Sequence, residues 1–115
     1  MYYTGAGLRA RSFFLCFFLA TAALPAAAGD PAAGRAKAEM TCRTCHGLDG
    51  VATIPMAANL AGQQKLYLVA QLEAYRSGKR RHEQMSIIAQ LLSDEDIENL
   101  AEWYAGIRIT VEMPE

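Results

Sequence analysis

Cys42 and Cys45 are separated by two residues, and His46 follows directly. Two thiols at this spacing stand roughly one helical turn apart. That separation matches the two vinyl groups on one edge of a haem, and the next residue can direct its imidazole at the iron. The motif therefore predicts one covalently bound haem c, with Cys42 and Cys45 as attachment sites and His46 as an axial ligand of the iron.

Two other uses of paired cysteines fit the sequence less well. A thioredoxin-type dithiol requires strands and helices in alternation, and no strand pattern of any length is present. A zinc site requires two further ligands at suitable spacing, and His82 is the only other histidine. The haem interpretation is favoured because the motif, the expected export and the helical pattern agree.

The sixth ligand decides what a bound haem can do. A methionine opposite a histidine raises the reduction potential and suits electron transfer. Met85 lies 39 residues after His46, in an expected loop between helices, far enough to reach the opposite face of the haem. Met56 follows too closely, and Met40 belongs to the first helix. Met85 is the predicted distal ligand; His82 is the alternative, and would give two histidine ligands and a lower potential.

Pro55 has two interpretations. The second ring nitrogen of a ligating histidine usually donates to a carbonyl oxygen, which fixes the ring. The start of the loop after His46 is well placed to supply that carbonyl. Pro55 could equally be a simple turn residue.

The first 28 residues have the order of a secretory leader. Arg9 and Arg11 precede an apolar run at residues 13–24, and three alanines end at Ala28. Cleavage is expected after Ala28, leaving residues 29–115 as one domain in the bacterial periplasm. The alternative is a retained anchor, but an apolar run of roughly 12 to 17 residues is short for a bilayer, which takes about 20. No stable membrane insertion is expected after cleavage.

The charge balance excludes one class of partner. The whole chain of 115 residues carries 11 basic and 12 acidic side chains, and loss of Arg9 and Arg11 with the leader leaves 9 and 12. Binding of nucleic acid would need a basic stripe. Instead, basic residues gather between 65 and 82 and acidic ones between 94 and 102, an asymmetry that can steer docking to redox proteins.

Helices are expected at residues 31–40, 64–77 and 86–92, with a last helix from Ser93 to Gly106. Asp30 and Ser93 are the expected N-caps, and Pro31 suits a first helical position. Residues 47–63 show no period, and a loop of that length suggests a functional role. Residues 79–85 are expected as a polar loop, and Ile87, Ile88, Leu91 and Leu92 are expected to point inward.

These blocks resemble the class I c-type cytochromes, above all one lobe of the bacterial periplasmic di-haem cytochromes and their single-haem relatives. The resemblance rests on Gly34 eight residues before Cys42, on residues 54–63, on Tyr67, Gln71 and Leu72, on residues 78–80, and on residues 92–97 and 100–104. It implies an all-α fold of about four to five helices wrapped around one haem. Only one C-x-x-C-H motif occurs, so the chain is not the di-haem protein itself.

The resemblance also implies roles for single residues. Pro55 would supply the carbonyl to His46, Leu60 would pack on the proximal face of the haem, and Met85 would ligate the iron. Residues 57–58 are additional to the family's loop. From their charge, Arg80 and Arg81 are alternative candidate partners of a haem propionate.

The expected function is that of a monomeric, non-enzymatic carrier passing one electron between periplasmic redox partners, such as a dehydrogenase or a membrane oxidase. The alternative is a haem c subunit of a periplasmic dehydrogenase or of a sulfur-oxidising complex, which would look the same in sequence. A ligand-binding sensor or a peroxidase would need an open sixth position. The availability of Met85 argues against that third possibility.

Overall fold

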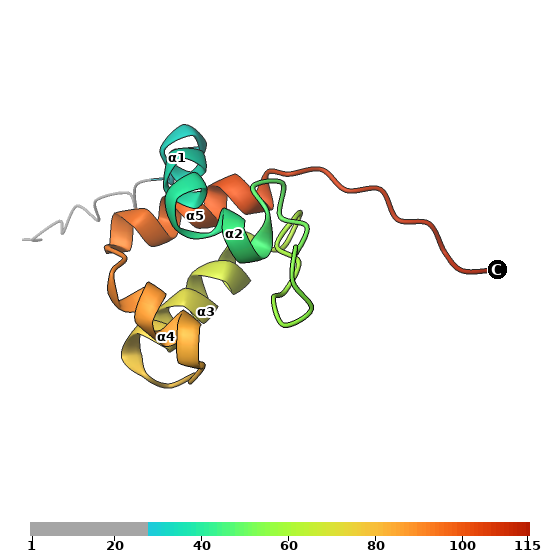
Figure 1. Ribbon diagram of the computed structural model, residues 1–115. Coiled ribbons are helices and arrows are strands. Elements are labelled where there is room, and N and C mark those ends of the chain that lie inside the picture. The colour runs from blue at the N-terminus through green and yellow to red at the C-terminus, as the bar shows by residue number, and fades with distance from the viewer. Residues whose placement is uncertain (1–27) are drawn as a thin grey trace, which may run out of the picture.

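The computed structural model describes residues 28–115, and the expected leader lies outside the described residues except for Ala28. The described part contains five helices and no strand, which confirms the expected all-α class. Their bounds are α1 Pro31–Thr41, α2 Arg43–His46, α3 Lys65–Ser77, α4 Glu83–Gln90 and α5 Asp94–Ala105. Figure 1 shows α5 in the middle of the bundle, and after it the chain runs away from the body to the C-terminus.

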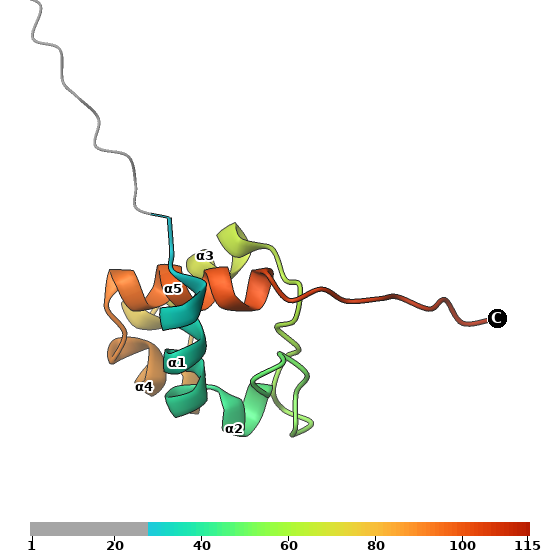
Figure 2. The same cartoon turned by 90° about the horizontal axis from the view of Figure 1, so that it is seen from above.

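Helix α1 begins and packs as the sequence indicates. The Asp30 side chain accepts a hydrogen bond from the backbone N–H of Ala32 at 2.8 Å and so caps the helix. Gly34 then allows a very close crossing with α5, since a Cβ at this position would stand 1.9 Å from the carbonyl oxygen of Asn99. The Asn99 side chain also accepts from the Asp30 N–H at 2.6 Å. The two helices cross near the start of α1, as Figure 2 shows.

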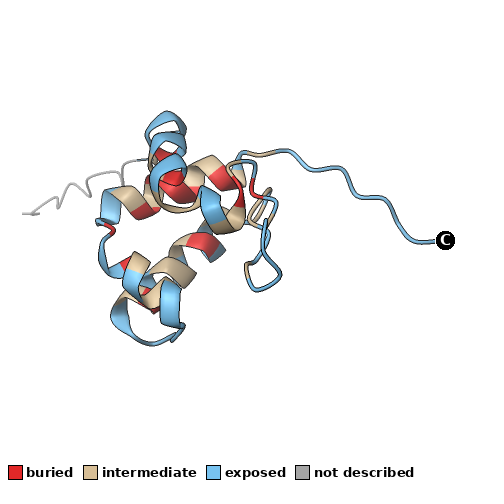
Figure 3. Cartoon of the chain, in the orientation of Figure 1, coloured by how far each residue is buried: buried red, intermediate tan, exposed pale blue. Residues whose placement is uncertain are grey.

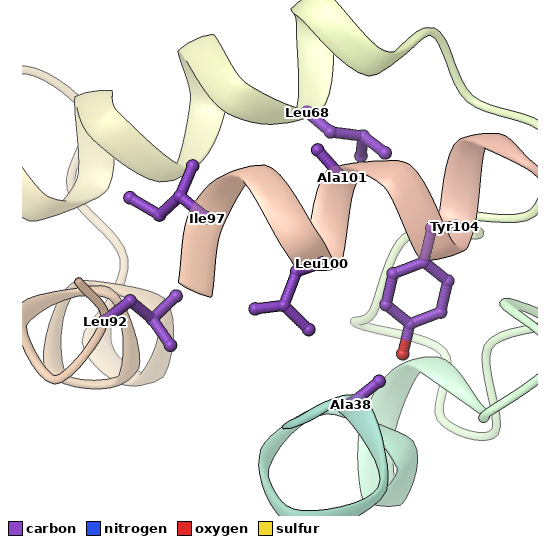
Figure 4. Packing of buried hydrophobic residues seen from close by; sticks show 7 residues of the cluster. All are labelled: Ala38, Leu68, Leu92, Ile97, Leu100, Ala101 and Tyr104. Carbon is purple, nitrogen blue, oxygen red and sulfur yellow. The ribbon is translucent and has the colours of Figure 1, made fainter. Parts of the chain in front are cut away.

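The hydrophobic core is built around α5. Ile97, Leu100, Ala101 and Tyr104 are all buried on this helix, at the spacing of one helical face. Figure 4 shows them meeting side chains from the other helices, and Figure 3 shows buried positions concentrated along α5 and the faces turned toward it. The partners in this cluster are Ala38 of α1, Leu68 of α3 and Leu92, which follows α4.

Helix α4 differs from the expectation in two ways. It begins at Glu83, three residues early, because His82 acts as N-cap and its Nδ1 accepts from the Met85 N–H at 3.3 Å. Met85 therefore lies in the first turn of a helix and not in a loop. Ile87 and Leu91 were expected inside, but 63% and 72% of their surfaces are exposed. In a helix, side chains at 85, 88, 89 and 92 share one face, which leaves Ile87 and Leu91 outside it.

The end of α3 and the start of α5 confirm their expected signals. Gly78 ends α3 in the left-handed conformation, with φ 78°. Ser93 and Asp96 form a reciprocal capping box at the start of α5, since each side chain accepts from the other residue's N–H at 3.0 Å. Hydrogen bonds from Ser93 and Lys37 hold the pKa of Asp96 below its usual value, although burial alone would raise it.

The charge asymmetry of the sequence is largely neutralised in the fold. Three cations from other helices pair with acids of α5: Lys37 with Asp96, Lys65 with Glu98 and Glu102, and Arg76 with Asp94. Within residues 28–115, the basic segment 79–81 has no ion pair and is exposed. Positive charge is therefore left uncompensated in the connection between α3 and α4.

Among the described residues, no helix is long and apolar enough to cross a membrane.

The close crossing at Gly34 predicts that replacing this glycine by alanine destabilises the protein, although the same substitution usually stabilises a helix. Glycine-to-alanine changes within helices normally stabilise, by about 0.5–1 kcal/mol. We expect Gly34→Ala to destabilise by about 1–3 kcal/mol, because the added methyl group would push α1 away from Asn99. Denaturant unfolding measures this change. Ala36→Gly on the exposed side of the same helix is the control, with an expected loss of about 0.5–1 kcal/mol. A stabilised Gly34→Ala protein would contradict the close crossing.

Candidate haem site

The two motif cysteines flank the short helix α2. Cys42 is the residue at the junction of α1 and α2, and Cys45 lies within α2. Both are free thiols and both are half-buried. Burial raises the pKa of the Cys42 thiol, while hydrogen bonds with Thr41 and Tyr104 act in the opposite direction. The helical turn between them gives the spacing that the sequence predicts for attachment to two vinyl groups.

The imidazole of His46, at the end of α2, is fixed by a backbone carbonyl. Its Nδ1 lies 2.7 Å from the carbonyl oxygen of Ala58. Because a carbonyl oxygen only accepts hydrogen bonds, Nδ1 carries the proton in this contact. The neutral ring then keeps its lone pair on Nε2, the nitrogen that remains free to bind a metal. The side chain is therefore in the tautomer that an axial ligand requires.

The carbonyl that fixes His46 is not the one expected. The sequence resemblance assigned it to Pro55, three residues before Ala58. Pro55 is exposed and follows Ile54 in a tight turn, in which the Ile54 carbonyl accepts from the Ala57 N–H at 3.2 Å. Proline suits this second position of a turn because its φ is already set. The turn and the additional residues 57–58 shift the contact to Ala58, so Pro55 is a turn residue.

The loop after α2 closes on itself and on the end of that helix. Thr53 donates from its hydroxyl to the Thr44 carbonyl at 2.7 Å and from its N–H to the Cys45 carbonyl at 2.9 Å. These bonds satisfy carbonyls that a helix end leaves without partners. Further along, the Leu60 N–H donates to the Gly50 carbonyl at 2.7 Å. The loop that carries the Ala58 carbonyl is thereby tied to α2 itself.

Two aromatic side chains of α5 hold the chain just after His46. The Tyr104 hydroxyl donates to the Gly47 carbonyl, and the Trp103 indole N–H donates to the Leu48 carbonyl, each at 3.0 Å. Neither Trp103 nor Tyr104 was predicted from the sequence to have a role at the site. No local pattern marks these contacts, because they join residues more than 50 positions apart.

The two candidates for the distal ligand differ in burial and in hydrogen bonding. Met85 is half-buried and lies on the inward face of α4. His82 is exposed, and its Nδ1 accepts the bond that caps α4. In a neutral ring the proton is then on Nε2, which leaves no free lone pair for iron. Helices α2 and α4 lie apart in both views, α2 beside α1 and α4 beside α3.

The structure also describes the surroundings of the two remaining predicted residues, Leu60 and Arg80. Leu60 is half-buried against the hydrophobic core. The Arg80 guanidinium donates to the Gln71 side chain at 2.6 Å and lies 4.7 Å from the centre of the Tyr75 ring. This places Arg80 over α3 in an ordered position. Contacts of Leu60 and Arg80 with a haem remain predictions.

The donor set of this site fits haem c. It combines two free thiols one turn apart, a histidine with a free Nε2 and a half-buried methionine on a separate helix. Residues 29–103 match the family model described as cytochrome c oxidase, cbb3-type, subunit III. The chain therefore belongs to this family of c-type cytochromes and binds haem c covalently. The match spans α1 to α4 and most of α5.

Known proteins of this kind are similar to the chain over one domain. Cytochrome c-554(548) of Halomonas halodenitrificans is 46% identical over 82 residues, which cover 69% of this chain and 98% of the relative. The structure of reduced cytochrome c4 from Pseudomonas stutzeri matches with a TM-score of 0.66 and 33% identity, over 73% of this chain and 48% of that one. The chain spans about half the length of the curated cytochrome c4 relatives it matches.

A larger assembly contains a similar domain. The structure of a thiosulfate dehydrogenase from Marichromatium purpuratum matches with a TM-score of 0.63 and 34% identity, over 67% of this chain and 18% of that one. A similar domain thus accounts for nearly all of one relative, about half of another and less than a fifth of a thiosulfate dehydrogenase chain. All three support the class I cytochrome c fold expected from the sequence.

The conformation of Gly47 predicts that this residue is needed for haem attachment. Its φ is 72°, and an added Cβ would stand 2.4 Å from both the Asp49 carboxylate and the Val51 carbonyl. We expect Gly47→Ala to displace His46 and to lose most of the covalent haem, as measured by haem staining after denaturing electrophoresis.

Gly78 provides a matched control for this substitution. It also has a positive φ, 78°, and also ends a helix, but an added Cβ would meet nothing within 4 Å. Gly78→Ala should therefore cost about 1–2 kcal/mol of stability from backbone strain and keep its haem. If Gly47→Ala retained haem as fully as Gly78→Ala, the crowding at Gly47 would not matter for the site.

Proposed function

We propose that this protein carries single electrons between periplasmic redox partners. In this proposal Cys42 and Cys45 attach the haem, and His46 and Met85 bind its iron. The observation that carries the proposal is the His46 ring, which is fixed through Nδ1 by Ala58 and keeps Nε2 free. The chemistry that haem c supplies is reversible one-electron transfer at the iron. With both axial positions filled by protein side chains, no position is open for a substrate.

Cys42 and Cys45 would hold the haem through two thioether bonds, one from each free thiol. Because two bonds and one ligand come from five consecutive residues, the cofactor stays with the protein through every redox cycle. A carrier that travels between partners requires such permanent attachment.

The axial ligands give a direct test of the proposal. Ferric haem with a methionine ligand has a near-infrared absorption band, and we expect the wild-type protein to show it. Met85→Ala should lose this band, whereas His82→Ala should keep it because His82 caps α4 from the outside. Stopped-flow mixing of the ferrous wild-type protein with hexacyanoferrate(III) should oxidise one equivalent per haem. Retention of the band in Met85→Ala, or rapid binding of carbon monoxide by the wild-type protein, would contradict the proposal.

A second candidate function is that of a haem subunit in an oxidoreductase. The similarity to part of a thiosulfate dehydrogenase favours it. The uncompensated basic segment 79–81 supports contact with an acidic partner surface under either candidate. The two candidates differ in whether the partner stays bound.

Native chromatography of a periplasmic extract separates the two candidates. For a free carrier we expect haem staining at the elution volume of one small domain, and for a subunit at that of a larger complex. Mass spectrometry of the same fraction tests the proposed removal of residues 1–28, for which the mature protein begins at Gly29. A longer N-terminus in membrane fractions would instead indicate a retained anchor.

A further inference from the structure

One side chain of α5 contacts the chain directly after the haem-binding motif. Tyr104 is only 2% exposed, and Figure 4 shows its ring projecting from α5 toward Ala38 of α1. Its hydroxyl donates to the carbonyl of Gly47, the residue that follows His46. A single buried phenol therefore holds the backbone carbonyl that directly follows the axial histidine.

The backbone conformation of Gly47 is one that a contact from another part of the chain can help to hold. Its φ of 72° and ψ of 152° belong to a region that residues with a Cβ essentially do not enter. Glycine has no side chain to hold this conformation, so the chain direction after His46 depends on what binds its backbone. Two donors reach the buried Gly47 carbonyl, the Tyr104 hydroxyl at 3.0 Å and the Gly50 N–H at 3.3 Å, and only the first comes from outside the loop. The contact thus fixes the backbone on one side of His46, as the Ala58 carbonyl fixes its ring.

We propose that Tyr104 is a positioning residue for the axial histidine, and that its hydroxyl sets the direction in which the His46 ring meets the haem iron. The inference rests on the proposed role of His46 as axial ligand. It goes further because it assigns the orientation of that ligand to a residue 58 positions away in the sequence. The aromatic ring of Tyr104 belongs to the core, so the proposed role resides in the hydroxyl alone.

Trp103 offers a matched comparison on the same helix. Its indole N–H donates to the Leu48 carbonyl at the same distance, 3.0 Å, but one residue further from His46. Tyr104→Phe removes one donor and keeps the ring, whereas Trp103→Phe removes one donor together with part of a ring that packs on the core. If the haem ligand responded only to lost packing, Trp103→Phe would change it at least as much as Tyr104→Phe. A positioning role makes only Tyr104→Phe change the haem ligand.

The experiment compares the two variants with the wild-type holo-protein in the ferric state. Two quantities are measured: the thermal midpoint, and the hyperfine-shifted proton resonances of the His46 ring and the haem methyl groups. These resonances report the orientation of the histidine plane above the haem. We expect both variants to lower the midpoint, by roughly 4–8 °C for a domain of this size. We expect only Tyr104→Phe to change the resonance pattern, and Trp103→Phe to keep that of the wild type.

Three outcomes decide the proposal. An unchanged pattern in Tyr104→Phe, or an equal change in both variants, would overturn it. If Tyr104→Phe yields no holo-protein, the wild type decides: its Tyr104 hydroxyl proton must exchange slowly with solvent and show a nuclear Overhauser effect to Gly47, and rapid exchange would overturn the proposal. A wild-type protein that binds haem but fails to pass electrons would contradict the proposed function alone, because the His46 resonances are read without electron transfer.

Discussion

The docking of α5 is the constraint on which the haem site depends. At its start and middle, the crossing with α1 is possible because Gly34 has no side chain to keep Asn99 away. At its end, Trp103 and Tyr104 bind the carbonyls of Leu48 and Gly47. Helix α5 therefore holds α1 in place and also sets the path of the chain as it leaves α2. A change in how α5 packs would reach the axial histidine through these two hydrogen bonds.

The core around α5 contains few large side chains that are fully buried. Within residues 28–115, Ile97 is the one large side chain with less than 2% of its surface exposed. Chains of this size bury a modest share of their surface, and many need a further source of stability. Covalently bound haem c supplies a large apolar surface. Several half-buried apolar side chains border the core and would be available to pack against the haem surface. They include Leu60, Val69 and Leu72.

The sequence predicted the local features of this fold and missed the distant ones. Caps at Asp30 and Ser93 were predictable because a cap and its helix are neighbours in sequence. The start of α4 was missed because histidine is an uncommon N-cap, so nothing marked His82 as one. The carbonyl for His46 was assigned to Pro55 by resemblance, but the two additional residues 57–58 alter the loop. The contacts of Tyr104 and Trp103 had no sequence signal, since they depend on how α5 docks.

This division between local and distant contacts bears on why the haem is bound covalently. The thiols and the histidine are neighbours in sequence, so the attachment motif is complete within one turn of helix. The contacts that orient His46 through Gly47 come from a helix more than 50 residues later. Closing a loop of that length costs conformational entropy, and the packing of α5 offsets this cost. Whenever α5 is undocked, histidine ligation alone would hold the cofactor weakly, because the ring is not yet directed. Two thioether bonds keep the haem in place until long-range packing has oriented its ligand.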